Sequence, residues 1–265
     1  MIVQDTTILW NQPAAPGYYR MGLACAGGFD AAKPGQFIML RTGAQTSPLL
    51  RRPFSLLGLI RDGDQVTGIE ILFKVVGKGT HKLSCCRKGE RLSVIGPLGN
   101  AFLVPDDCRH LVLVAGGVGV PPIRFLAQSL LERDGILDRC VVFIGGRTKD
   151  DLVCIGEFDL PGFLLDISTD DGSQGHQGVV TRSLKRALDQ GPVDLVCACG
   201  PPAMLKAVAA IAEARGIPCQ VSIEAMMACG MGACLGCAVR VRDDDAHYRH
   251  VCMDGPVFDA HRLAW

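Results

Sequence analysis

The chain has 265 residues, and its 27 Lys and Arg side chains balance 27 Asp and Glu, so the formal net charge is zero. This balance argues against nucleic acid or an anionic membrane as the main partner, because both need a concentrated basic excess. A hydrophobic content of 48% is ample for a core and argues against disorder. We find no apolar run long enough to cross a bilayer and no secretory signal, and therefore expect a cytoplasmic protein.

Thirteen cysteines are the unusual feature of the composition. Their number is odd, they are scattered from Cys25 to Cys252, and no export signal accompanies them, so a disulfide framework explains them poorly. We expect most of them to be small buried side chains and a subset to bind metal.

Residues 1–105 contain short β-rich segments, among them 37–40 and 69–75, which are separated by turn residues such as Pro34-Gly35. Many short strands with few helical periods predict a small antiparallel β barrel.

A different pattern, strand then helix, repeats through residues 106–223. The expected strands are 111–115, 140–144, 164–168, 195–199 and 219–223, and the expected helices are 121–132, 181–188 and 202–215. Continuous apolar runs are typical of strands buried on both faces of a parallel sheet. This alternation predicts an α/β domain with a nucleotide site at the carboxyl ends of its strands.

Residues 224–265 form a third segment, which is too short to bury much core without a metal or a partner. Four cysteines are spaced there with four, two and fourteen residues between them: Cys229, Cys234, Cys237 and Cys252. Four thiolates meet the requirement of a two-iron, two-sulfide cluster, and the interleaved glycines allow the backbone to wrap it. Structural zinc is the alternative, although it usually has two short cysteine knuckles and this segment has short spacing at one end only.

Two segments of the predicted barrel carry residues suited to a flavin. Arg51-Arg-Pro-Phe-Ser55 offers an arginine for a pyrophosphate, an aromatic ring for stacking and a hydroxyl for a ring nitrogen. Gly77-Lys-Gly-Thr80 could open a short helix whose free amides face phosphate oxygens. Taken alone, the first could equally be a loop leading into a strand, and the second a tight hairpin.

Two further turns follow strands of the predicted sheet. Gly116-Gly-Val-Gly119 lies between strand 111–115 and helix 121–132, where close approach to a dinucleotide pyrophosphate requires glycine. Cys199-Gly200 ends another strand at the same edge of the sheet, where a nicotinamide could lie. Strand-to-helix turns without a ligand remain the alternative for both.

Four motifs resemble, in sequence and order, the ferredoxin–NADP reductase superfamily of flavin enzymes: Arg52-Pro-Phe-Ser55, Gly79-Thr80, Gly116-Gly-Val-Gly119 and Cys199-Gly-Pro-Pro202. The C-terminal segment is more specific. Residues 224–237 and 251–258 resemble the electron-transfer subunits of NAD-dependent, class 1B dihydroorotate dehydrogenases. The match covers essentially the whole chain.

The resemblance implies an N-terminal FAD-binding barrel (1–105), an NAD-binding α/β domain (106–223) and a C-terminal [2Fe-2S] module (224–265). It also implies a partner, the FMN-containing catalytic subunit that oxidises dihydroorotate to orotate in pyrimidine synthesis, usually in a heterotetramer of two chains of each kind. Electrons would pass from FMN through the cluster and FAD to NAD+. The residues of this chain would position the carriers, and none is assigned as an acid or base.

The resemblance further implies site residues. FAD would contact Arg52, Pro53, Phe54, Ser55, Leu72, Phe73, Lys74, Gly79 and Thr80. The cluster would be ligated by Cys229, Cys234, Cys237 and Cys252. NAD would approach Gly116, Gly117, Gly119, Cys199 and Gly200. Two positions depart from the superfamily: Phe54 replaces a common tyrosine, and Lys74 replaces a common arginine and so loses bidentate geometry.

Nicotinamide preference is open in the sequence. Arg147 would favour the 2′-phosphate of NADP, whereas Asp170 and Asp171 would repel it, and solvated loop residues are the alternative for all three. The resemblance favours NAD.

The expected partner surface is the end of the C-terminal module that carries Met226, Met227, Met231 and Leu235. Packing of these side chains within the module is the alternative. Two other functions also remain open. One is a reductase of the same superfamily that serves a ferredoxin, hydrogenase or oxygenase component. The other is a zinc-stapled binding module without redox chemistry. The ending Asp254-Gly-Pro-Val-Phe258 favours the dehydrogenase subunit.

Overall fold

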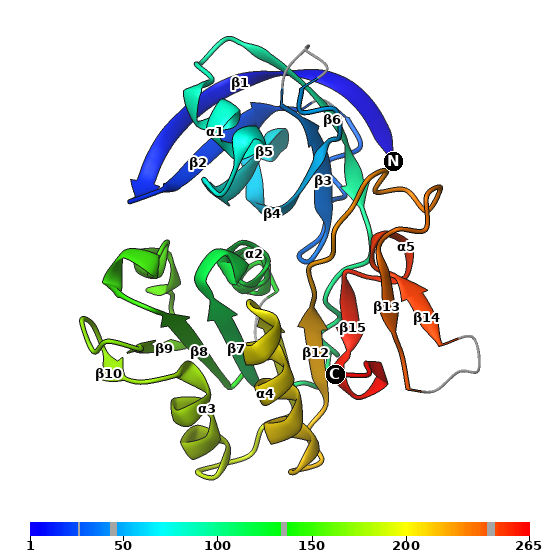
Figure 1. The fold of residues 1–265 in the computed structure, drawn as a ribbon. Coiled ribbons are helices and arrows are strands. Elements are labelled where there is room, and N and C mark those ends of the chain that lie inside the picture. Colours follow the sequence, from blue (N-terminus) through cyan, green and yellow to red (C-terminus); the bar gives the residue numbers. More distant parts are fainter. Residues whose placement is uncertain (26, 43–46, 134–136, 243–246) are drawn as a thin grey trace.

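The computed structural model describes residues 1–265 except 26, 43–46, 134–136 and 243–246. The described chain forms an N-terminal β barrel above a sheet flanked by helices, with a small C-terminal unit beside them (Figure 1). No helix in the described residues is long and apolar enough to cross a membrane.

The N-terminal part is a closed antiparallel barrel, which confirms the prediction for this region. Its strands, in the order β1-β2-β5-β4-β3-β6, are β1 (Ile2–Ala15), β2 (Tyr18–Ala24), β3 (Phe37–Arg41), β4 (Arg52–Asp62), β5 (Gln65–Lys74) and β6 (Arg91–Leu98). Alternating apolar side chains point inward because successive residues of a strand face opposite sides. Ile8, Met21, Leu56 and Ile71 are fully buried there. A short helix, α1 (Lys78–Cys85), follows β5.

The second part is a twisted sheet whose strand order, in the described residues, is β10-β9-β8-β7-β11-β12-β15. Its strands are β7 (His110–Gly116), β8 (Arg139–Gly146), β9 (Phe163–Thr169), β10 (His176–Gln177), β11 (Leu195–Cys199) and β12 (Cys219–Ser222), which are parallel, and β15 (Val257–Asp259). The predicted helices are present as α2 (Val120–Leu131), α3 (Val180–Leu188) and α4 (Pro202–Glu213). Short 3-10 turns are η1 (Gly117–Gly119), η2 (Lys149–Asp151), η3 (Ile155–Phe158) and η4 (Ala260–Arg262).

Helices cover both faces of this sheet, which explains the continuous apolar runs of its strands. Ile123 of α2 packs in one buried cluster with Leu113 of β7. Leu184 of α3 and Val208 of α4 pack in another cluster with Val114, the next residue of β7. Since adjacent strand residues point to opposite faces, α2 lies on one side of the sheet, and α3 and α4 lie on the other.

The C-terminal segment returns to the sheet. It forms a two-stranded hairpin of β13 (Ala238–Arg240) and β14 (Tyr248–His250), then α5 (Val251–Asp254), and ends with β15. β15 pairs antiparallel with β12, with Phe258 opposite Val221. The sequence analysis did not predict this strand, because three residues are too few to show a period. The cysteine module is therefore joined to the α/β sheet by backbone hydrogen bonds.

Charged side chains join the barrel to the α/β domain. Glu157 of η3 accepts from Arg20 of β2 over 2.6 Å and from Arg124 of α2 over 2.8 Å. Arg20 also pairs with Glu70 of β5, and Arg124 donates to the Leu57 carbonyl oxygen of β4 over 3.0 Å. This network, which we call the Glu157 cluster, fixes β2, β4 and β5 against α2 and η3.

Candidate functional site

A cavity of about 340 Å³ lies between the barrel and the carboxyl ends of β11 and β12. Its barrel wall consists of residues that the sequence assigns to FAD: Arg52, Pro53, Phe54, Ser55, Leu72, Phe73, Lys74 and Thr80. Gly79 lies directly behind, since a Cβ atom there would be 3.3 Å from Nε of Arg52. The opposite wall includes Cys199 and residues 222–225. We call this space the flavin cavity.

The chemistry of this wall fits a flavin nucleotide. Phe54 is half-buried in the cavity wall and offers an apolar surface for an aromatic ring system, and Phe73 supports it from the barrel core with the two ring centroids 5.9 Å apart. Arg52 donates to the Leu50 carbonyl oxygen over 2.7 Å and uses one nitrogen for this bond, so other donors remain for a phosphate. The cavity thus combines an aromatic face with a cation.

Thr80 organises the loop that enters α1. Its hydroxyl oxygen accepts from the Val76 amide over 2.9 Å and from the Gly77 amide over 3.2 Å. The helix that the sequence allowed at this point is present, so the tight hairpin is excluded. The turn directly borders the flavin cavity through Val76 and Thr80.

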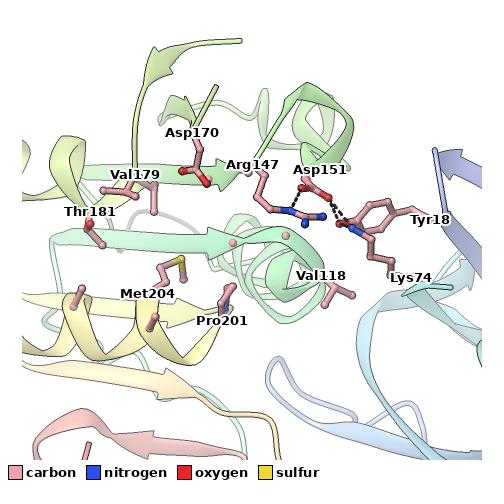
Figure 2. A pocket seen from close by; sticks show the side chains of 17 residues that line it. Tyr18, Lys74, Val118, Arg147, Asp151, Asp170, Val179, Thr181, Pro201 and Met204 are labelled. Atoms are coloured by element: carbon pink, nitrogen blue, oxygen red, sulfur yellow. Dashed lines mark hydrogen bonds and ion pairs between the residues drawn. The ribbon is translucent and has the colours of Figure 1, made fainter. Parts of the chain in front are cut away.

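A second cavity, of about 530 Å³, lies over the carboxyl ends of β7 and β8 and the first turns of α3 and α4 (Figure 2). Gly116 and Gly117 line it, as the sequence suggests. It touches the flavin cavity, because Lys74 and Val118 line both. We call it the dinucleotide cavity.

The other residues assigned to NAD lie elsewhere. Gly119 packs against β11, where an added Cβ atom would lie 2.4 Å from the Cys199 carbonyl oxygen. Cys199 lines the flavin cavity, and burial raises the pKa of its thiol to about 12. Gly200 lines a separate hollow beside Leu205 and Trp265. The contact of these three residues with NAD therefore stays a prediction.

One carboxylate organises the boundary between the two cavities. Oδ1 of Asp151 accepts from the Tyr18 hydroxyl over 2.7 Å and from Nζ of Lys74 over 2.8 Å, and Oδ2 accepts from Nε of Arg147 over 3.1 Å. Burial opposes ionisation of Asp151, but hydrogen bonds from Lys74, Tyr18 and Arg147 outweigh it and hold its pKa well below the usual range. These residues are the Asp151 cluster.

Sequence reasoning identified Lys74 and Arg147 of this cluster but missed Tyr18 and Asp151. No motif surrounds either residue, and 133 positions separate them in the chain. The structure places Tyr18 opposite Lys74 in the pairing of β2 with β5, a register that the sequence alone does not give.

The two acidic residues weighed for nicotinamide preference have different places. Asp170 lines the dinucleotide cavity, as Arg147 does. The Asp171 carboxylate accepts from the Ser173 amide over 2.9 Å and from its hydroxyl over 2.6 Å, and these bonds lower the pKa of Asp171. The Asp171 carboxylate therefore stabilises its own turn, and of the two acidic residues only Asp170 lines the dinucleotide cavity.

The four cysteines of the C-terminal module form two pairs. The Sγ atoms of Cys237 and Cys252 are 3.3 Å apart. The Cys234 amide donates to Sγ of Cys229 over 3.4 Å, and the Met231 amide donates to the same sulfur over 3.4 Å. The Met231 amide is the main cause that lowers the pKa of Cys229 to about 6, which favours the thiolate.

This arrangement fits a two-iron cluster. Two irons need two thiolates each, whereas one metal ion needs its ligands to converge on a point. Gly230 and Gly232 have positive φ angles of 72° and 82°, and such backbone, open to glycine, lets the loop wrap a cluster.

The four apolar residues of the expected partner surface divide into two classes. Met226 and Leu235 are exposed, at 91% and 58% of their surface. Met227 and Met231 are half-buried and pack against a buried cluster shared by the α/β sheet, the barrel and the module. The alternative interpretation, packing within the module, therefore has support at Met227 and Met231 and none at Met226 and Leu235.

Two family models match the chain. The iron-sulfur cluster binding domain of dihydroorotate dehydrogenase B matches residues 224–264. The oxidoreductase NAD-binding domain matches residues 113–210. The first range contains the paired cysteines, and the second contains the glycine turn and most of the dinucleotide cavity.

Solved structures share the fold. An NADH-dependent reduced ferredoxin-NADP oxidoreductase has a TM-score of 0.85 and 29% identity, covering 98% of this chain and 90% of that chain. A Neisseria gonorrhoeae ferredoxin NADP+ reductase with bound FAD and NADP has a TM-score of 0.67 and 17% identity. The match covers 81% of this chain and 92% of that chain.

Curated relatives match over nearly their full length. The dihydroorotate dehydrogenase B (NAD(+)) electron transfer subunit of Desulforamulus reducens is 36% identical over 99% of this chain and 98% of its own. The subunit of the same name from a Geobacillus species is 37% identical over 97% of this chain and 96% of its own. At this identity and coverage, the protein belongs to the family of dihydroorotate dehydrogenase B (NAD(+)) electron transfer subunits.

Proposed function

We propose that this chain takes electrons from an FMN-containing dihydroorotate dehydrogenase subunit and passes them through a [2Fe-2S] cluster and FAD to NAD+. The observation that carries the proposal is the order of three neighbouring sites. Glu224, Ala225 and Met227 line the flavin cavity, and Met227 lies two residues before Cys229. Lys74 and Val118 line the flavin cavity and the dinucleotide cavity alike. An electron route needs such closely spaced carriers.

The residues of the chain bind and orient these carriers. When bound, the cluster carries one electron at a time, nicotinamide takes two, and FAD can hold either number. Cys229, Cys234, Cys237 and Cys252 ligate the cluster. Residues 52–55, 72–74 and 79–80 hold FAD. Gly116 and Gly117 allow the NAD+ pyrophosphate to approach the end of β7, and Gly119, Cys199 and Gly200 are the further residues that we predict to contact NAD+ at this edge of the sheet.

We assign the three tasks to three parts of the chain. The barrel (1–105) binds FAD, the α/β domain (106–223) binds NAD, and the module (224–265) binds the cluster. The pairing of β15 with β12 ties the module to the nucleotide domain. This pairing fixes the module against the edge of the nucleotide domain.

The partner is the FMN-containing catalytic subunit, in a heterotetramer with two chains of each kind. Exposed apolar side chains beside the cluster ligands support this assignment: Met226, Leu235 and Met253. A zero net charge suits a stable complex that does not depend on long-range steering.

A second function draws support from the structural similarity to an NADH-dependent reduced ferredoxin-NADP oxidoreductase over 98% of this chain. In that case a ferredoxin would replace the dihydroorotate dehydrogenase subunit as electron partner. Assays of the same preparation with each partner distinguish the two functions.

The experiment that tests the proposal is an anaerobic NADH titration of the purified chain. NADH should bleach the flavin absorbance, and iron and sulfide should be present in equal amounts. A colourless protein that contains zinc would contradict the proposal and support the non-redox binding module.

A further inference from the structure

The Asp151 cluster joins the two halves of the chain at the wall of the dinucleotide cavity. Lys74 and Tyr18 come from adjacent barrel strands, whereas Arg147 and Asp151 follow β8 of the α/β domain. Figure 2 shows the Asp151 carboxylate between Arg147 on one side and Tyr18 with Lys74 on the other. All four side chains line the cavity.

Both cations keep unused donors while they are bound to Asp151. Lys74 has three N–H groups and gives two of them, to Asp151 and to the Tyr18 hydroxyl, over 2.8 and 3.0 Å. In the described part of the chain, Arg147 gives Nε to Asp151, and its two terminal nitrogens remain. An anion in the cavity can therefore bind Lys74 and Arg147 without displacing Asp151.

The cavity has two chemically different ends. One end, at Tyr18 and Val118, adjoins the flavin cavity. The other end is lined by Val179, Met204 and Ala207 and suits an adenine ring. Figure 2 shows Arg147 between Val179 at one end and Tyr18 at the other. A dinucleotide extended between these ends would have its pyrophosphate near the middle.

We propose that Asp151 is a positioning residue for the dinucleotide, which holds Lys74 and Arg147 so that their free donors meet the pyrophosphate. The inference rests on the proposed function, because it requires NAD in this cavity. Tyr18 acts as the fixed support: it is buried, at 2% exposure, and its hydroxyl binds the same carboxylate oxygen as Lys74.

Whether substitution of Asp151 weakens or strengthens anion binding distinguishes a positioning role from a purely electrostatic one. If charge alone mattered, removal of the negative charge of Asp151 would relieve its repulsion of a bound anion and strengthen anion binding. Removal of the group that orients two cations should weaken it, because their side chains regain rotational freedom. The Asp151→Asn variant keeps the size of the side chain and can still accept from Tyr18.

The Glu157 cluster provides a matched control. Glu157 joins the same two halves of the protein through Arg20 and Arg124, and it does not line the dinucleotide cavity. If Asp151 only held the domains together, Glu157→Gln should have the same effect as Asp151→Asn.

The test measures dissociation constants of ADP-ribose, by calorimetry, and of adenosine, by competition, on the protein loaded with FAD and cluster. We expect Asp151→Asn to weaken ADP-ribose by about tenfold. Adenosine, which lacks the pyrophosphate, should bind as in the wild type, and Glu157→Gln should change neither. Equal or tighter ADP-ribose binding by Asp151→Asn, or an equal loss in Glu157→Gln, would overturn the inference.

A second variant guards against misfolding of Asp151→Asn. Arg147 is 75% exposed, so Arg147→Gln should fold normally. It should weaken ADP-ribose several-fold and leave adenosine unchanged, and unaltered ADP-ribose binding would overturn the inference. If the wild type bound neither ADP-ribose nor adenosine, the proposed function itself would fail. Failure of the proposed function is thus distinguishable from failure of the inference about Asp151.

Discussion

Nζ of Lys74 lies 2.8 Å from Oδ1 of Asp151, and this contact joins the last residue of a barrel strand to the α/β domain. The hydrogen bond to Asp151 raises the pKa of Lys74, and those from Lys74, Tyr18 and Arg147 lower the pKa of Asp151 against the effect of burial. Burial raises the pKa of Tyr18, so that its hydroxyl stays neutral. Lys74 and Asp151 therefore both stay charged over a wider pH range than an ordinary lysine and aspartate.

A flat pH dependence follows. The ordinary pKa values of Asp and Lys bracket the interval from about pH 5 to about pH 9, and the shifts widen it at both ends. The ratio of the ADP-ribose dissociation constants of Asp151→Asn and wild type should therefore stay constant from about pH 6 to about pH 9. Calorimetry at several pH values measures this ratio. A fall toward one at high pH would show that Lys74 loses its proton there, contrary to our expectation.

Gly119 should be intolerant of substitution for a packing reason. A Cβ atom in Gly119→Ala would lie 2.4 Å from the Cys199 carbonyl oxygen and 2.6 Å from the Gly200 amide nitrogen, both backbone atoms. We expect a loss of about 1–3 kcal/mol in the free energy of unfolding, measured by denaturant titration. Gly156→Ala is the control, because an added Cβ atom there meets nothing within 4 Å. Equal stability of the two variants would refute the packing account.

Thr80 should matter for FAD through the loop it organises. Thr80→Val keeps the shape of the side chain but leaves the Val76 and Gly77 amides without their acceptor. A lost cap of this kind costs about 1 kcal/mol, which corresponds to about fivefold weaker FAD binding. Flavin fluorescence during dialysis measures the release. Thr80→Ser keeps the hydroxyl and should retain FAD, so similar release by both variants would speak against this role.

The apolar side chains beside the cluster should bind the catalytic subunit. Met226→Glu puts a charge at a side chain that is 91% exposed, and burial of that charge in an interface should weaken the complex at least about tenfold. Gel filtration and calorimetry with the FMN subunit measure the change. Leu164→Glu is the matched control, since Leu164 is 54% exposed on β9, toward the other edge of the sheet. If both substitutions weakened the complex equally, Met226 would have no specific place in the interface.

Local patterns in the sequence predicted most of the fold. The apolar run 195–199 matches β11 residue for residue, and the helix at 202–215 differs from α4 only at its end. Each of these elements has a local pattern long enough to predict it, a continuous apolar run for the strand and a helical period for the helix. β15 has three residues and gains its hydrogen bonds from β12, so no local pattern marks it.

Candidate site residues could be proposed from the sequence where the relevant side chains are neighbours in the chain. The spacing of the cysteines and the segment 52–55 are local. Residues 52–55 line one cavity wall and the cysteines lie as two pairs, while their roles toward FAD and the cluster stay predictions. The Asp151 cluster was missed because Tyr18 and Asp151 meet only after the barrel docks on the α/β domain. Contacts of such high sequence separation follow from tertiary packing, which a single sequence does not reveal.

The cluster route from dihydroorotate to NAD+ is the central claim, and one assay tests it most directly. The chain is co-expressed with the FMN subunit, and dihydroorotate-dependent reduction of NAD+ is measured for the wild type and for Cys234→Ala. Cys85→Ala is the control, because Cys85 is an exposed cysteine outside the module. We predict that Cys234→Ala abolishes NAD+ reduction while the FMN subunit still reduces an artificial dye with dihydroorotate. NAD+ reduction that persists in Cys234→Ala, or without this chain, would contradict the account.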